Sequence, residues 1–455
     1  MGTVGEIVKH SWLHFNQQDL QTERQQCLDE GKDLSSLETE FAELQSLDLE
    51  SDPSLQSRVH ALMDRAEELP MREDYSYEEP SDLVSIRALR PDGPRRFDGP
   101  LTELEIFDRI HAAWVGRCAG NLLGKPIETW RSEKIWSYLK DLGQFPLSAY
   151  IASEGPDEVL AKYELDRGEA FIDRVPHAVE DDDLNYTVSG LAILKKRGSG
   201  FTPNDVAQFW LENIPAMRTY TAERVAYRNF MEGIDPPRSA SYRNPYREWI
   251  GAQIRADFWG YAALGNPELA AEYAWRDASI SHVKNGIYGE MWVAAMIASA
   301  PFVSGAREVL QTGLAEVPVN CRLASRVREI VEWKEEGLGY DEAVGRLHER
   351  CDEHSFHDWC HTLTNAQVVA VGLLWGEDQF ESSICKAVQA CFDTDCNGAT
   401  VGSIHGMRHG LASIPDKWSG PLNDRLETAV MGYLLKPISE LAKETFETYR
   451  SLRGD

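Results

Sequence analysis

Two short acidic motifs hold the side chains of this chain that are best suited to chemistry. The first occupies residues 180–183 (Glu-Asp-Asp-Asp) and the second residues 393–397 (Asp-Thr-Asp-Cys-Asn), and each leads straight into an apolar stretch. Adjacent carboxylates repel one another unless a cation or the positive end of a helix compensates them. Each motif alone is also an ordinary helix start, because aspartate is a common capping residue. Two of them converging in a bundle core would form an oxygen-lined site for Mg²⁺, Mn²⁺ or Ca²⁺ rather than zinc.

The elements that must position these motifs are predicted to be helices. Thr102 and Glu105 fit a capping box, in which each side chain bonds the other residue's backbone amide. Apolar residues recur at helical spacing over 37–47, 55–69, 184–196, 269–279, 288–301, 366–375, 381–391, 399–411 and 426–435. Convincing strand alternation is almost absent. We therefore expect an all-α, compact multi-helix bundle with a central metal site, and a long functional loop over 215–248.

The N-terminal part of the chain differs in composition from the rest. Residues 1–96 carry 21 acidic and 10 basic side chains, and prolines 80, 91, 94 and 100 interrupt the segment that follows residue 74. We predict two units. Residues 1–100 would form an acidic helical appendage with a linker arm, and residues 101–455 the main domain.

The overall charge and the cysteine pattern exclude several classes of protein. A formal net charge of −28 argues against a nucleic-acid partner, since phosphate contacts need clustered Lys and Arg. No apolar run is long enough to span a membrane, and residues 1–19 do not read as a leader peptide. We expect a soluble, cytoplasmic protein with no membrane partner. The eight cysteines include no CxxC pair, so reduced thiols are expected.

Taken as a set, these motifs resemble those of the ADP-ribosylglycohydrolase family. The two acidic motifs are similar to the family's Thr-Asp-Asp-Thr and Asp-Thr-Asp-Ser/Thr signatures. Segment 111–128 resembles the opening helix that ends in a functional glutamate, and segment 281–286 resembles the Ser/Thr-His segment of the substrate cleft. Segment 400–404 continues the second motif as the family does. The resemblance covers residues 102–445 and implies a bacterial-type member of this all-α fold.

The resemblance also implies roles for the matching residues. Two divalent ions, Mg²⁺ first among the candidates, would be held by Glu180, Asp181, Asp182, Asp393, Asp395 and Cys396. Glu128 would act in catalysis with Asp182 and Asp395, since a carboxyl group suits proton transfer at a glycosidic carbon and a cation activates water. Substrate would be bound by His282, Asn285, Gly286, Gly251, Arg255 and Asn397.

Three departures from the family pattern concern the metal and the phosphate subsite. Glu180 stands where threonine is usual, and Cys396 stands where serine or threonine is usual. A thiol is a poor partner for Mg²⁺, so Asn397 is the alternative oxygen donor. The segment around Gly251 lacks the further glycines that let backbone amides approach a diphosphate. We therefore expect a weak phosphate subsite, with Arg218, Arg243 or Arg255 as the compensating groups.

These features predict an enzyme. We expect a metal-dependent glycohydrolase that cleaves an N- or O-ribosyl bond in an ADP-ribosylated protein or a related nucleoside-like small molecule. A non-catalytic relative that binds ADP-ribose or a nucleotide is one alternative, although the four aspartates and Glu128 are all retained. Metal-dependent glycosyl transfer through the DxD motif at residues 393–395 is the other, although such enzymes need a nucleotide-binding sheet.

Overall fold

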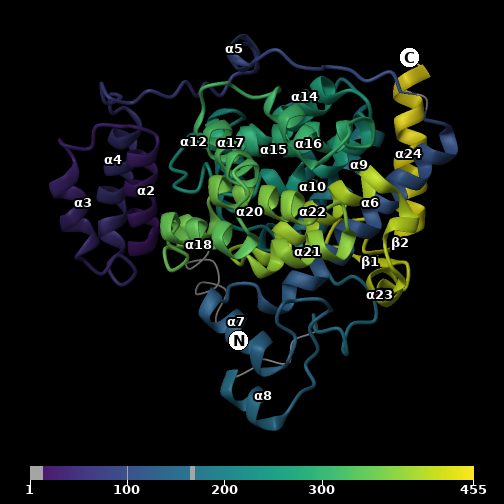
Figure 1. The fold of residues 1–455 in the computed structure, drawn as a ribbon. Helices are drawn as coiled ribbons and strands as arrows, with labels where there is room; N and C mark the ends of the chain where they lie inside the picture. The colour runs from purple at the N-terminus through teal and green to yellow at the C-terminus, as the bar shows by residue number, and fades with distance from the viewer. Residues whose placement is uncertain (1–13, 100, 164–169, 455) are drawn as a thin grey trace.

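The structure is a computed structural model that describes residues 14–99, 101–163 and 170–454. Over these residues the fold is all-α apart from one small hairpin, as predicted (Figure 1). The prediction that residues 1–19 are not a leader peptide falls mostly on residues 1–13. These residues lie outside the described part of the chain. No helix among the described residues is long and apolar enough to cross a membrane.

The described elements follow one another along the chain in three groups. The appendage and arm contain α2 (Gln17–Asp29), α3 (Glu38–Gln45), α4 (Gln56–Glu67) and α5 (Leu83–Leu89). The first half of the body contains α6 (Glu103–Gly124), η3 (Lys125–Ile127), α7 (Ser132–Asp141), α8 (Asp157–Tyr163), α9 (Asp182–Arg197), α10 (Pro203–Asn213), η4 (Ala216–Arg218), α11 (Thr221–Met231), α12 (Arg238–Ser241), η5 (Gln253–Arg255), α13 (Asp257–Ala262) and α14 (Pro267–Ala278). The second half contains α15 (Lys284–Ser299), α16 (Ala306–Leu314), α17 (Arg322–Glu335), α18 (Tyr340–Arg350), α19 (Phe356–Cys360), α20 (Thr362–Trp375), α21 (Phe380–Gln389), α22 (Thr394–His409), α23 (Asp416–Ser419), β1 (Arg425–Glu427), β2 (Leu435–Pro437) and α24 (Ile438–Gly454).

Glycines bring the two central helices, α6 and α22, into backbone contact. Gly116, Gly120 and Gly124 recur every four residues and therefore share one face of α6. A Cβ on Gly120 would lie 1.9 Å from the carbonyl oxygen of Gly398, and one on Gly116 would lie 2.2 Å from that of Gly402. Only residues without a side chain permit this approach. The close pair places the C-terminus of α6 directly beside the first turn of α22.

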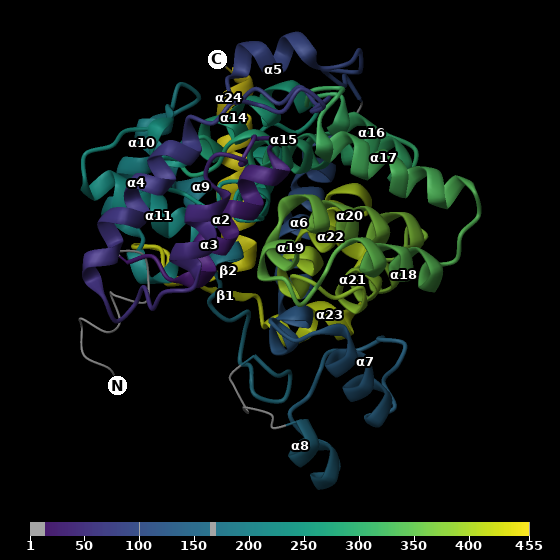
Figure 2. The same ribbon diagram turned by 90° about the vertical axis from the view of Figure 1, so that its left-hand side faces the viewer.

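The appendage has a small core of its own. Phe41, Leu44, Leu62 and Met63 belong to a buried cluster of α2, α3 and α4 that is separate from the large core of the body. In Figures 1 and 2 these three helices stand as a group against one side of the body. The arm that follows carries α5 across the side of the body opposite α7 and α8.

The contact between the appendage and the body is largely ionic. Arg247 pairs with Glu23 at 2.6 Å and with Glu30 at 2.5 Å, and all three side chains are buried. Arg243 pairs with Asp64 at 2.7 Å nearer the surface. Some acidic residues of the N-terminal segment thus pair with cations of the body, which their composition alone did not predict.

Two sequence predictions are wrong. Residues 426–435 were expected to be helical, but β1 and β2 form an antiparallel hairpin in which Leu426 pairs with Lys436. Leu426 is buried and also bridges Ala178, and Gly432 has a φ of +86° in the turn, so tertiary contacts override the apolar spacing. The segment 215–248 is not one long loop, because it contains η4, α11 and α12. The remaining predicted helices and the Thr102–Glu105 capping box are confirmed.

Candidate functional site

Both acidic motifs begin helices, and each supplies the N-cap residue of its helix. Asp181 is the N-cap of α9, and its side chain accepts a hydrogen bond from the backbone N–H of Asp183 at 2.9 Å. Asp393 is the N-cap of α22, with Asp395 in the first turn. Each motif therefore points its carboxylates at the positive end of its own helix, which partly offsets their mutual repulsion.

The fold brings the two motifs together with Glu128. The side chains of Glu128, Asp393 and Asp395 offer oxygen atoms within 4.8 Å of one another, and those of Asp181, Asp182 and Asp183 do the same. Asp183 joins the two groups, because it also forms such a set with Asp395 and Cys396. Positions more than two hundred residues apart thus form one acidic cluster, as the sequence predicted for a metal site.

A lysine that the sequence analysis did not single out lies in this cluster. The Lys125 ammonium is 2.7 Å from Glu128 Oε2 and 3.3 Å from Asp395 Oδ2, and it also forms an ion pair with Asp181. Lys125 was visible three residues before Glu128, but nothing in its local sequence tells a buried ion-pairing lysine from a solvated one.

Burial and mutual repulsion set the protonation of the cluster. Burial, followed by repulsion from Asp181, holds the pKa of Asp182 well above its usual range. Burial and the neighbouring Asp395 raise the pKa of Glu128 to about 8 and outweigh the opposing effect of Lys125. Asp181 behaves differently, because attraction to the Lys125 ammonium overcomes the effect of burial and lowers its pKa. The cluster therefore binds protons in the absence of further positive charge.

The donor set fits a hard divalent cation. Asp395 Oδ1 and Asn397 Oδ1 are buried and accept no hydrogen bond from the described residues, so both are available as ligands. The thiol of Cys396 is less suitable, since burial and the nearby carboxylates keep its pKa well above the usual value. Glu180 lies at the rim, where it pairs with Arg218 at 2.9 Å and accepts from Asn185 at 2.8 Å.

A cavity of about 540 Å³ opens beside the cluster. Lys125, Glu180 and Arg218 form part of its wall, and Glu427, Thr428, Ala429 and Leu434 of the hairpin region form another part. This volume lies in the range usual for small-molecule sites. The hairpin that the sequence analysis mistook for a helix is therefore part of the wall of the candidate substrate pocket.

Five of the predicted substrate residues lie in buried networks, and none of them lines this cavity. Arg255 donates to Asp277 at 2.6 Å and to Glu223 at 2.8 Å, and a Cβ on Gly251 would meet the Glu223 carboxylate. His282 bonds Ser281 at 2.8 Å in the same network. Asn285 bonds Glu248 at 3.0 Å, and Gly286 packs against His282. Their substrate role stays a prediction, while their visible role is to hold the core together.

Asn365 is a second residue that the sequence analysis missed. Its Oδ1 accepts hydrogen bonds from Asn397 Nδ2 at 2.8 Å and from the backbone N–H of Asp393 at 3.3 Å. Its own amide nitrogen donates to the carbonyl of His361 at 3.1 Å. Asn365 on α20 thus fixes the start of α22 and orients the Asn397 side chain. A single asparagine in the sequence carries no signal for such a contact.

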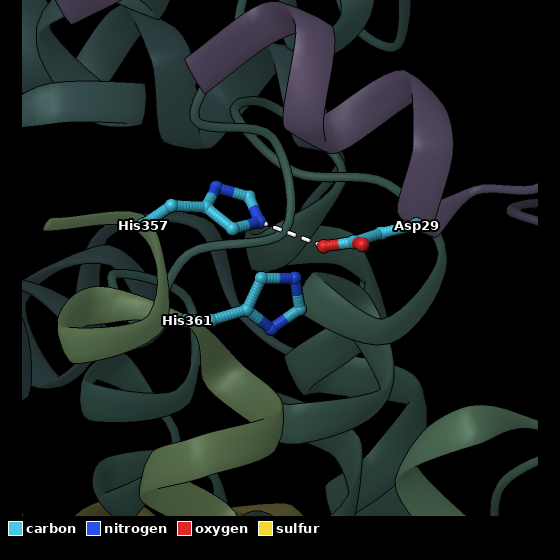
Figure 3. Close-up of side chains that lie close together, drawn as sticks. All are labelled: Asp29, His357 and His361. Atoms are coloured by element: carbon cyan, nitrogen blue, oxygen red, sulfur yellow. Dashed lines mark hydrogen bonds and ion pairs between the residues drawn. The ribbon is translucent and has the colours of Figure 1, made fainter. Parts of the chain in front are cut away.

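A further cluster of metal-ligating residue types, formed by Asp29, His357 and His361, joins the appendage to the body (Figure 3). The indole N–H of Trp249 donates to His357 Nδ1, and the backbone N–H of Leu363 donates to His361 Nδ1, each at 3.1 Å. When neutral, both rings therefore carry their proton on Nε2. The Nε2–H group of His357 donates to Asp29 Oδ2 at 2.9 Å. A metal ligand needs a free lone pair at this nitrogen, so the arrangement is a hydrogen-bonded contact.

Fold and site together define an all-α protein with an oxygen-rich acidic cluster at two facing helix starts. The sequence profile of the ADP-ribosylglycohydrolase family matches residues 102–451, and the chain belongs to this family. The family supports a glycosyl-hydrolase type of enzyme that acts on ADP-ribose-related substrates. A solved structure titled "ADP-ribosylglycohydrolase-related protein complex" is 20% identical, with 77% of this chain and 99% of that chain covered and a TM-score of 0.48. No curated protein matches the chain.

Proposed function

We propose that the chain is a metal-dependent glycohydrolase that cleaves an N- or O-ribosyl bond. The observation that carries the proposal is the convergence of Glu128 with both acidic motifs beside a cavity of about 540 Å³. A proton donor, a cluster of cation ligands and space for a small substrate then lie in one place, which is what hydrolysis of a glycosidic bond requires.

The cation would be Mg²⁺, with Mn²⁺ or Ca²⁺ as alternatives. Asp181, Asp182, Asp393 and Asp395 are the carboxylate ligands of the proposed site, and the free Asn397 Oδ1 is a neutral one. When bound, the ion supplies positive charge that attracts ribose hydroxyls and favours the ionisation of water.

Glu128 is the proposed general acid. Burial and repulsion from Asp395 raise the pKa of its carboxyl group, which favours the protonated form that can release a proton to the leaving atom as the bond to the anomeric carbon breaks. Lys125, at 2.7 Å, stabilises the carboxylate that remains. The same carboxylate can then accept a proton from the attacking water.

Arg218 is the residue most able to bind a phosphate of the substrate. Arg255 is fully buried in ion pairs, and Arg243 is held by Asp64 of the appendage. The Arg218 side chain is 57% exposed and lines the cavity, so it can exchange its partner Glu180 at the rim for a phosphate. We propose an ADP-ribosylated protein or a nucleoside-like ribosyl compound as substrate, bound with a modest contribution from the diphosphate.

The test is turnover with Mg²⁺ on an ADP-ribosylated protein and on nucleosides, with the released sugar measured. Wild-type protein should hydrolyse one of them, and Glu128→Gln and Asp395→Asn should each lose at least about 100-fold in rate while keeping the fold. Substrate binding without any release would favour the non-catalytic alternative, and sugar transfer to an acceptor other than water would favour the glycosyltransferase.

The phosphate subsite has its own measurement. Dissociation constants for ADP-ribose and for its phosphate-free nucleoside analogue should differ by less than about 100-fold, because a single guanidinium replaces a cradle of backbone amides. Arg218→Met should remove most of this difference, whereas Arg243→Met should not. A gain of several kcal/mol from the diphosphate would contradict the proposed weak subsite.

A further inference from the structure

The position of Lys125 bears on how many metal ions the acidic cluster can hold. Its ammonium contacts three carboxylates that come from three separate parts of the chain, namely Glu128, Asp181 and Asp395. All three belong to the residues that the family resemblance assigns to metal binding or catalysis. An ammonium surrounded by carboxylates from both motifs lies where a bound cation is expected.

The backbone that carries Lys125 is fixed against the second motif. A Cβ on the preceding Gly124 would lie 2.3 Å from the carbonyl carbon of Thr394 and 2.4 Å from the amide nitrogen of Asp395. The Thr394 hydroxyl donates to the carbonyl of Gly124 at 2.9 Å. The side chain of Lys125 therefore starts at the edge of the cluster, and only 26% of it is exposed.

A divalent ion at this position would need the same carboxylate oxygens as the ammonium. Ligand distances for Mg²⁺ are roughly 2.0–2.1 Å, so an ion bound by Asp181, Asp395 and Glu128 would have to displace Nζ. The donors that Lys125 does not contact include Asp393 and the free Oδ1 atoms of Asp395 and Asn397. With water, these donors suffice for one ion, because Mg²⁺ usually keeps several waters and needs few protein ligands.

We propose that the Lys125 ammonium occupies one of the two cation positions of the acidic cluster, so that the chain binds one divalent ion instead of two. The inference rests on the proposed function, since it takes the cluster to be a metal site. Lys125 then acts as a positioning residue, because it holds Glu128, Asp181 and Asp395 together from a fixed point on the chain.

The experiment counts Mn²⁺ ions bound by the full-length protein. Metal-stripped wild-type protein and the variants Lys125→Met, Lys125→Gln and Arg218→Met are titrated with Mn²⁺ by calorimetry, and each saturated sample is examined by electron paramagnetic resonance. Lys125→Met keeps the apolar stem of the side chain, and Lys125→Gln is a second neutral variant in case the first does not fold. Arg218→Met is the matched control, because it removes a cation whose ion pair is with the rim residue Glu180.

Wild type and Arg218→Met should each bind one Mn²⁺ per chain and give the six-line spectrum of an isolated ion. The neutral Lys125 variants should bind two ions and give the spectrum of a spin-coupled pair. Their first ion should also bind about tenfold more tightly or better, since a repelling charge is gone.

Two ions in the wild-type protein would overturn the inference, because the ammonium would then simply move aside. One ion in the folded Lys125 variants would overturn it as well, since the lysine would not be what excludes the second ion. No Mn²⁺ binding by wild type or by any variant would instead remove the metal site itself, and with it the metal dependence of the proposed function.

Discussion

The contact between α6 and α22 leads to a prediction about Gly120. In Gly120→Ala the new Cβ would lie 1.9 Å from the carbonyl oxygen of Gly398 and 2.3 Å from its carbonyl carbon. The obstacle is backbone on both helices, so no side chain can turn away. The helices must separate by about 1 Å before this contact reaches an acceptable 3.0 Å.

Overpacking of this kind typically costs about 1–3 kcal/mol and occasionally more. Alanine returns about 1 kcal/mol because it is a better helix former than glycine. A clash with rigid backbone belongs at the upper end of the range, so we expect a net loss of about 2 kcal/mol in the free energy of unfolding. The separation also moves Glu128 and Lys125 away from Asp395, so Mg²⁺ should bind more weakly.

The assay is urea unfolding followed by circular dichroism, together with a calorimetric Mg²⁺ titration. Gly345→Ala in α18 is the matched control, because nothing lies within 4 Å of its added Cβ. That variant should gain about 0.5–1 kcal/mol from helix propensity and bind Mg²⁺ normally. If Gly120→Ala is as stable as Gly345→Ala and binds Mg²⁺ as wild type does, the close helix pair does not position the site.

Three further outcomes are expected. Saturating Mg²⁺ should raise the melting temperature, with about 2.7 kcal/mol of added stability when the Mg²⁺ concentration is 100 times the dissociation constant. A chelator should reverse this gain, and an unchanged melting temperature in both conditions would contradict the metal site. Burial lowers the pKa of His361 from 6.5 to about 3. Between these pH values the unfolded chain binds a proton that the folded chain does not. The free energy of unfolding should therefore fall by up to about 1.4 kcal/mol per pH unit on acidification. In a pH series of urea melts, His361→Asn should lose this part of the slope. Arg247→Met removes the cation paired with buried Glu23 and one of the cations around Glu30, which keeps Lys284, and it should cost about 3–5 kcal/mol in urea unfolding. Arg238→Met breaks a pair that is exposed at Arg238 and should cost about 1 kcal/mol or less; equal losses in the two variants would refute the assignment of the buried network.

Local sequence determined the helices that begin at the acidic motifs. Capping by Asp181 involves the residues that immediately follow it, and helical periodicity is a property of neighbouring positions, so both are readable without a fold. The convergence of the two motifs was expected, and the structure makes it through Asp183, a residue that was not assigned to the site, and Asp395. The same local pattern failed at residues 426–435, because Leu426 is held by Ala178 and by a strand partner rather than by its neighbours in sequence.

Only the tertiary structure decided what surrounds these motifs. The burial of Arg255 among Asp277 and Glu223 depends on residues far away in the chain, and so does the use of Gly116 and Gly120 as a helix contact. Lys125 shows the reason most clearly. A lysine is solvated by default, and it becomes an internal cation only where carboxylates from remote segments meet around it. Spacing in the sequence specifies which residues lie on one helix face, but the charge of a site is the sum over every segment that the fold brings to it.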